Sequence, residues 1–193
     1  MERNVKISLE KAREWYKSDN ESLKEIALQA FEESELVVNP WETIKTFEDA
    51  CEVLNIDPKN VDFIFDSHLE NMYKLQIVKK ALNGVDWEPK LNTGDIYYPW
   101  LKYYPENCSF NSNWKHVASF KCKEDNKVYI LVGSSYTYYG GGLGYFSCGY
   151  GEVEANTGLL GCKSEEIAKY FSITFGKLMF DTLYGQYNNY TWV

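Results

Sequence analysis

Tyrosines and glycines fill the most unusual stretch of the chain, residues 134–145, which reads SSYTYYGGGLGY. Tyrosine offers a rigid, amphipathic contact surface, and glycine lets a ligand approach the backbone. We therefore expect a binding loop whose contact residues are Tyr136, Tyr138, Tyr139 and Tyr145. The alternative is a hairpin tip, in which the glycines supply the positive φ that tight turns require.

These glycines do not match a phosphate-binding loop. A P-loop reads Gly-x-x-x-x-Gly-Lys-Ser/Thr and leads into a helix, and a dinucleotide fingerprint joins a strand to a helix. Residues 134–145 contain no lysine, and the composition of the residues that follow is typical of a strand. The sequence therefore predicts no cofactor at this stretch.

Residues able to act in catalysis are present but form no specific motif. Cys148 or Cys162 could serve as a nucleophile with His116 as its base, and Glu152 and Glu154 could act as paired carboxylates. The chain has no Gly-x-Ser-x-Gly elbow and no His-Glu-x-x-His pair. Pairs of this kind arise by chance in a chain with 28 acidic residues. We therefore predict a protein that is not an enzyme.

The cysteines also give no sign of a metal site. There are five, an odd number, with no Cys-x-x-Cys pair, and the two histidines, His68 and His116, stand far from any metal-ligand spacing. Cys122, Cys148 and Cys162 fall in strand-like segments, and we expect them to be free, buried thiols in a reducing compartment. No apolar run reaches the length of about 18 residues that a membrane span requires. The expected location is the cytoplasm.

Negative charge is confined to one part of the chain. The first 95 residues hold 12 Lys/Arg against 20 Asp/Glu, net −8, and the remainder holds 8 against 8. Binding to double-stranded DNA depends on Lys and Arg neutralising phosphates, so we do not expect it here. The acidic helices are interpreted as a cap on a sheet rather than as a DNA reader. That their acidic faces imitate nucleic-acid phosphates stays an alternative.

Helical spacing dominates the acidic part. Apolar residues recur every three or four positions after Ser8, after Asn20 and after the Thr46/Asp49 capping box. A fourth helix is predicted over 67–83, with Gly84 as its C-terminal cap. In the second stretch the apolar stripe is Leu23, Ile26, Ala27, Ala30 and Phe31.

The second part of the chain is rich in β-branched and aromatic residues. It predicts five strands, at 96–104, 116–122, 127–135, 145–150 and 159–162. Ser164 then caps a helix that is expected to run to Tyr184, and the tail 185–193 is expected to wrap or to pair at a sheet edge. Trp87, Tyr98 and Trp100 are expected to be mostly buried at the junction of the two parts.

The predicted fold class is α+β. A helical acidic region, 1–84, precedes an antiparallel sheet of about five strands with a C-terminal helix packed on it, 85–193. We expect the two regions to share one core.

Several strings of residues occur together in one order: ISLEKAREWYKS at 7–18, LKEIALQAF at 23–31, IKTFEDAC at 44–51, ALN at 81–83, WEP at 87–89, YYPW at 97–100 and CKSEEIAKY at 162–170. In this order they resemble an uncharacterised family of small proteins carried by Bacteroides-type gut bacteria and by their phages and prophages. The resemblance covers most of the chain. It implies a genomic setting and assigns no activity or site residues.

The function predicted from these observations is that of a non-enzymatic phage or prophage accessory protein that binds a host or viral partner. The partner is a protein or a small ligand. The alternatives are a virion structural component and a counter-defence protein that sequesters a small ligand or nucleotide. The sequence indicates no metal and no membrane, and it leaves oligomer formation open.

Overall fold

The computed structural model describes residues 7–61, 67–88, 96–138, 152–153 and 160–193. The chain divides into two compact units, 1–43 and 44–193. The boundary therefore falls after Thr43, whereas the change in composition that suggested a division at 84/85 lies inside the second unit. Each unit is described by itself below.

The first unit is helical. It contains three α-helices and a 3-10 turn, α1 (Leu9–Lys17), α2 (Glu21–Ala30), α3 (Glu33–Leu36) and η1 (Pro40–Thr43). Its small core consists of Ala12, Ala27 and Leu36, with partly buried apolar side chains packed around them. Arg13 fastens the end of α3, because its Nε donates to the Glu35 carbonyl at 2.7 Å.

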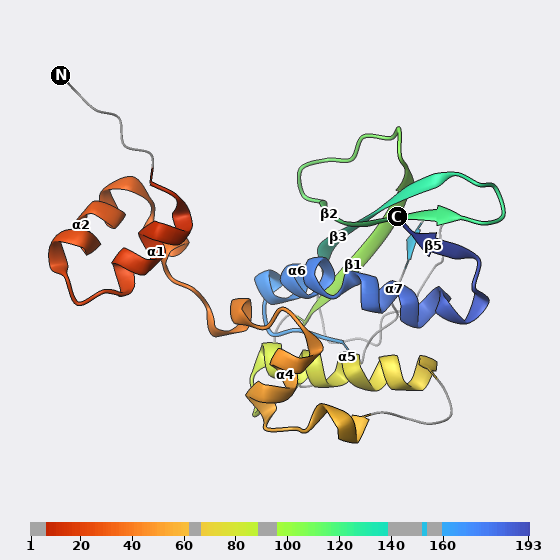
Figure 1. Ribbon diagram of the computed structural model, residues 1–193, viewed down its shortest axis with the longest axis horizontal. Coiled ribbons are helices and arrows are strands. Elements are labelled where there is room, and N and C mark those ends of the chain that lie inside the picture. The colour runs from red at the N-terminus through yellow and green to blue at the C-terminus, as the bar shows by residue number, and fades with distance from the viewer. Residues whose placement is uncertain (1–6, 62–66, 89–95, 139–151, 154–159) are drawn as a thin grey trace. The chain divides into compact units, whose positions relative to one another are not determined.

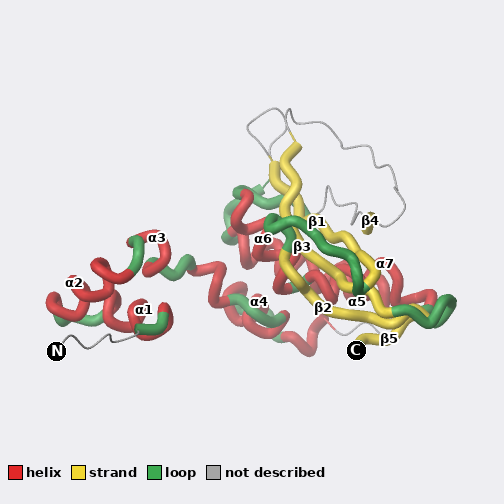
Figure 2. The backbone as a smooth tube through the Cα atoms, turned by 90° about the horizontal axis from the view of Figure 1, so that it is seen from above, coloured by secondary structure: helices red, strands yellow, loops and turns green. Residues whose placement is uncertain are grey.

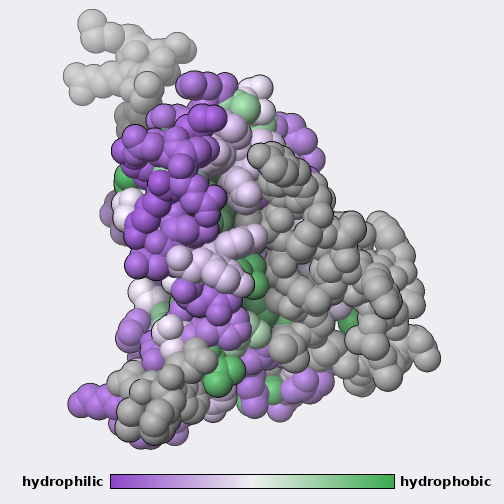
Figure 3. Space-filling model, turned by 90° about the vertical axis from the view of Figure 1, so that its right-hand side faces the viewer, coloured by the Kyte–Doolittle hydropathy of each residue, from purple (hydrophilic) through white to green (hydrophobic). Residues whose placement is uncertain are grey.

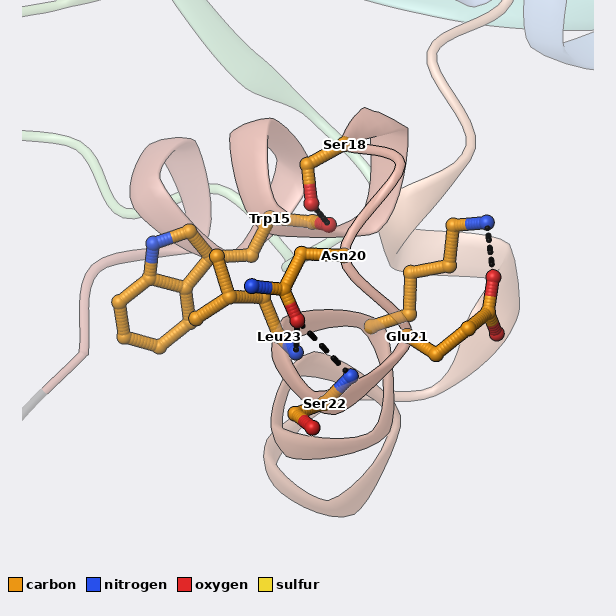
Figure 4. Close-up of polar contacts among 7 residues, drawn as sticks. Trp15, Ser18, Asn20, Glu21, Ser22 and Leu23 are labelled. Carbon is orange, nitrogen blue, oxygen red and sulfur yellow. Dashed lines mark hydrogen bonds and ion pairs between the residues drawn. The ribbon is translucent and has the colours of Figure 1, made fainter.

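Polar caps fix the corner between α1 and α2 (Figure 4). Ser18 Oγ donates to the Trp15 carbonyl at 2.8 Å as α1 ends. Asn20 then caps α2, its Oδ1 accepting from the backbone N–H groups of Ser22 and Leu23. Each cap satisfies a backbone group that a helix end leaves without an intrahelical partner. The predicted helix starts at Ser8 and Asn20 are confirmed.

The second unit is built on an antiparallel sheet. Its strands lie in the order β4-β1-β3-β2-β5, and the three long ones are side by side in Figure 2. Their bounds are β1 (Ile96–Pro105), β2 (Lys115–Cys122), β3 (Val128–Tyr138), β4 (Glu152–Val153) and β5 (Tyr190–Trp192). Every neighbouring pair is antiparallel.

Helices cover one face of this sheet in two layers (Figure 1). In the layer next to the sheet, α6 (Glu165–Thr174) packs against β1 and β3, and α7 (Gly176–Tyr184) packs against β2. On their far side lies α5 (Ser67–Asn83), against which α4 (Phe47–Leu54) packs. Two short 3-10 segments, η2 (Pro58–Val61) and η3 (Gly185–Tyr187), complete the described helices. The predicted α+β class, with a C-terminal helix on the sheet, is confirmed.

Three of the five predicted strands are confirmed as the long strands of the sheet. The runs predicted at 96–104, 116–122 and 127–135 are β1, β2 and β3. The run at 145–150 lies outside the described residues. Instead of a strand ending at Cys162, the structure has a single bridge between Cys162 and Tyr97. The tail does pair at an edge, as β5 beside β2.

The C-terminal helix was predicted to run unbroken to Tyr184, and this detail is wrong. The helix ends at Phe175, whose φ of −112° and ψ of 10° are not helical, and α7 begins at Gly176. At Gly176 the backbone approaches the sheet so closely that a Cβ would lie 2.9 Å from Leu101 Cδ2 and 3.0 Å from Val117 Cγ1. The break thus lets α7 lie against the sheet at a position that only glycine fits.

The surface has ordinary polarity. On the side shown in Figure 3, hydrophilic residues predominate and hydrophobic residues form only small areas. Across the part of the chain that the structure describes, we find no helix with the length and apolar character needed to cross a membrane.

Candidate functional site

The structure describes the backbone of two of the four tyrosines predicted to bind a partner. Tyr136 and Tyr138 belong to β3, where they pair with Tyr98 and Ile96 of β1. Both residues are therefore part of a strand and not of a loop. Tyr139 and Tyr145 lie outside the described residues, so the predicted tyrosine and glycine loop stays a prediction.

The residues considered for catalysis are not brought together where they are described. Cys162 is fully buried beside Asn83 on the side of the sheet that carries the helices, and burial raises the pKa of its thiol to about 12. His116 is exposed, with its Nε2 3.3 Å from Ser119 Oγ. A buried, protonated thiol is a poor nucleophile. Cys148 and Glu154 lie outside the described residues, and Glu152 is described only as backbone in β4.

The described cysteines, Cys51, Cys108, Cys122 and Cys162, are free thiols. Within the described ranges, no group of three or more His, Cys, Asp and Glu side chains is arranged to hold a metal ion.

The feature that stands out is the sheet face turned away from the helices. Side chains alternate along a strand, and Leu101 faces Gly176 of α7. The alternate residues of β1 therefore face the other way, and three of these five are aromatic: Ile96, Tyr98, Trp100, Lys102 and Tyr104. All five are half-buried. The term aromatic face is used below for Tyr98, Trp100, Lys102 and Tyr104 together with Phe110 and Trp114, which belong to the connection between β1 and β2.

The connection between β1 and β2, residues 106–114, passes over this face. Since β3 lies between β1 and β2, the connection must cross it. Ser134 Oγ of β3 donates to the Asn113 carbonyl at 3.2 Å, and Phe110 stacks on Tyr104 with ring centroids 6.1 Å apart. Val132 of β3 is fully buried on this face, whereas the rings of β1 are half-buried.

A lysine and two indoles form the centre of the aromatic face. Trp114 meets Trp100 edge to face, with ring centroids 5.0 Å apart. The Nζ atom of Lys102 lies 4.4 Å from the Trp100 ring centroid and 5.2 Å from that of Trp114. Such contacts hold an ammonium group against aromatic faces. The surface therefore combines flat rings with positive charge.

The strands beneath the aromatic face contain no acidic residue. β1, β2 and β3 together carry Lys102, Lys115, Lys121 and His116 and not one Asp or Glu, in a chain whose net charge is −8. The register of β3 places Lys102 and His116 in one row, on either side of Val132. Glu152 of the edge strand β4 is in register with the same row. The face is thus more positive than the chain as a whole.

Sequence reasoning missed this site, although a signal for it was present. Tyr98, Trp100, Lys102 and Tyr104 occur at every second position of a strand, which is the spacing of one sheet face. Trp87, Tyr98 and Trp100 were expected to be mostly buried at the junction of the two regions. Each is partly buried, but Tyr98 and Trp100 lie on the sheet face turned away from the helices. Phe110 and Trp114 reach this face only because β3 lies between β1 and β2. A local sequence pattern does not reveal that strand order.

Comparisons of the chain with protein-family models, with curated proteins and with solved structures find no match. The functional argument therefore depends on the fold and on the geometry of the aromatic face.

Proposed function

We propose that this protein is a non-enzymatic accessory protein of a phage or prophage that binds a host or viral partner through the aromatic face. The observation that carries the proposal is the cluster of half-buried Trp100 and Lys102 with buried Trp114, on the sheet face turned away from the described helices. Tryptophan and tyrosine are among the residue types that contribute most to binding at interfaces. The resemblance of the residue strings supports the genomic setting.

Binding fits the described side chains better than catalysis does. Cys162 and His116 are on opposite faces of the sheet, and Cys162 is protonated near neutral pH because burial raises its pKa to about 12. The aromatic face needs no activated nucleophile to act, because contact area and charge are sufficient for recognition.

A second candidate, a counter-defence protein that sequesters a nucleotide, is favoured by the same cluster. An aromatic ring can stack on a base, and the ammonium of Lys102 suits a phosphate. A virion component remains an alternative proposal, with the virion as its location. An accessory protein would act in the cytoplasm of the host.

The test compares two surface variants of the full chain. Trp100→Leu removes an indole from the aromatic face, and Tyr187→Leu removes an equally apolar ring that is 64% exposed in η3. Tagged wild type and both variants are expressed in host cells, and captured macromolecules and small molecules are identified. We expect one partner to be retained by wild type and by Tyr187→Leu, and to be lost from Trp100→Leu.

The proposal fails if every partner of the wild type is captured equally by Trp100→Leu, or if none is captured. Thermal unfolding of each variant shows whether it is folded. Lys102→Gln provides a second test if Trp100→Leu does not fold, since it removes the charge and leaves both indoles in place.

A further inference from the structure

We propose that the outer edge of β5 is a docking surface for a second copy of this chain, whose own β5 joins the sheet antiparallel to it across a two-fold axis. The proposal goes beyond the aromatic face, because it concerns an edge of the sheet and other residues. It is carried by the direction of the backbone groups of β5, by the residue types of this strand and by the charges of α7 beside it.

Two backbone hydrogen bonds show which groups of β5 face β2. The Val193 N–H donates to the Ser119 carbonyl at 3.0 Å, and the Lys123 N–H donates to the Asn189 carbonyl at 2.8 Å. Hydrogen-bonded pairs in an antiparallel ladder recur at every second residue. Positions 189, 191 and 193 therefore direct their backbone groups toward β2.

The residues between these positions direct their backbone outward. Tyr190 and Trp192 each present an N–H and a C=O at the outer edge of β5, which is the last strand in the sheet order (Figure 2). Among the residues that the structure describes, these groups have no hydrogen-bond partner. Natural sheet edges are often protected by a charge, a proline or a bulge, and the sequence YTW of β5 contains no charge and no proline. The edge can therefore accept one more strand.

A second β5 satisfies this edge when the two-fold axis passes beside Thr191. Thr191 of one copy then lies opposite Thr191 of the other, and Tyr190 of each copy lies opposite Trp192 of the other. Both of the outer pairs are hydrogen-bonded pairs of the new ladder. Every outward N–H and C=O of both strands thus gains a partner. Such an interface uses the same surface of both copies, as two-fold dimers do.

The side chains beside β5 favour a second copy over an unrelated strand. Lys177 of α7 is exposed, and its Nζ lies 4.9 Å from the Trp192 ring centroid. Asp181, one turn further along α7, accepts from Tyr190 Oη at 2.6 Å. Since Trp192 lies opposite Tyr190 of the second copy, the axis brings Lys177 of each copy toward Asp181 of the other. The edge is therefore complementary in charge to itself.

The dimer is expected to be weak. Stable interfaces bury about 1,200–2,000 Å² in total, and a strand as short as Tyr190–Trp192 contributes only a small part of such an area. We therefore expect the full chain to be monomeric in dilute solution and dimeric when concentrated. Sedimentation equilibrium over a wide range of protein concentration measures the dissociation constant.

The test places a charge on the two-fold axis. Thr191 is exposed, and Thr191→Lys sets two ammonium groups opposite each other in the dimer. This variant should raise the dissociation constant by about fivefold or more, because like charges directly opposite each other are unfavourable. Ser112→Lys, at an exposed position of the connection between β1 and β2, is the matched control and should leave the dissociation constant unchanged.

A second variant makes the test specific for pairing of two identical edges. Lys121 of β2 lies opposite Thr191, so a glutamate at position 191 suits the folded chain. Thr191→Glu alone should also dimerise more weakly than wild type. An equimolar mixture of Thr191→Lys and Thr191→Glu should recover the dimer, since opposite charges then meet on the axis. Dimers formed through another surface would show no such recovery.

A wild type that stays monomeric at every concentration overturns the proposal, and so does a dissociation constant that is unchanged in Thr191→Lys. A mixture of the two variants that fails to recover the dimer also overturns it, because residue 191 of one copy then does not meet residue 191 of the other. Thermal unfolding shows whether each variant is folded. If Thr191→Lys does not fold, Thr191→Glu is compared with wild type, and equal dissociation constants overturn the proposal.

Discussion

Trp114 stands edge-on to Trp100, with ring centroids 5.0 Å apart and ring planes at 62°. One indole comes from β1 and the other from the residue just before β2, so their contact fixes the end of the crossing connection to the sheet. Edge-to-face pairs of this kind contribute about 0.5–1.5 kcal/mol beyond the burial of their area. The same contact gives the aromatic face its rigid centre.

Gly133 marks the closest approach of the helix layer to the sheet. A Cβ at this position would lie 2.8 Å from Ser172 Oγ and 2.9 Å from the Ser172 carbonyl carbon and oxygen of α6. Gly133→Ala should therefore lower the free energy of unfolding by about 1–3 kcal/mol, measured by urea denaturation. Gly185→Ala is the control, because its φ of −56° suits alanine and the nearest atom is 3.9 Å away. Equal stability of the two variants would contradict the packing described here.

Asn83 joins the end of α5 to the segment before α6. Its Oδ1 accepts from the Lys163 backbone N–H at 2.8 Å, and its Nδ2 donates to the Lys79 carbonyl at 2.8 Å. The residue is only 2% exposed. Asn83→Ala should cost about 1–3 kcal/mol of unfolding free energy, because buried partners lose their hydrogen bonds. Asn60→Ala, at an exposed position of η2, should change it by less than about 0.5 kcal/mol.

Asp181 holds the terminal strand β5 through two side chains. Its Oδ1 accepts from Tyr190 Oη at 2.6 Å and from Trp192 Nε1 at 2.9 Å. Burial raises the pKa of Tyr190, and the hydrogen bond to Asp181 and the charge of that residue raise it further. The folded protein therefore keeps this proton when the unfolded chain begins to lose it, at about pH 10.

The stabilisation from Tyr190 is thus complete below about pH 10 and declines as the pH rises above that value. Wild type should be more stable than Tyr190→Phe at pH 8, and the difference should shrink in alkaline solution. Urea denaturation of both proteins across this range measures it. A difference that stays constant or grows with pH would refute the assignment.

The cysteines differ in their expected reactivity. Cys108 is exposed, whereas Cys162 is fully buried with a pKa raised to about 12. Because the thiolate is the reactive form, iodoacetamide at pH 8 should label Cys108 quickly and Cys162 only when the chain unfolds. Mass spectrometry of the labelled peptides measures both rates. Rapid labelling of Cys162 in the folded protein would show that its burial is wrong.

Local chemistry explains which helices could be predicted from the sequence. The starts of α1, α2, α4 and α6 depend on caps between residues no more than four apart, such as Thr46 with Asp49, and all four occur as expected. Gly84 likewise follows α5 with a φ of +90°. These features involve short-range hydrogen bonds, which a sequence pattern displays directly.

Features that depend on distant contacts could not be predicted. Ile26 was placed on a buried stripe, yet it is 41% exposed, because within the first unit α2 packs only on α1 and α3. The break at Phe175 follows from the fit of Gly176 against Leu101. The aromatic face was missed for the same reason, since it needs the connection 106–114 to cross β3.

Hydrogen–deuterium exchange of the full chain, with and without the partner captured from host cells, tests the binding role of the aromatic face most directly. The account predicts added protection in peptides covering 96–104 and 110–121, where the rings and cations of this face lie. Peptides from α1 and α2 should exchange at the same rate in both samples. Unchanged exchange over 96–104, or protection confined to other parts of the chain, would contradict the claim that this sheet face is the binding surface.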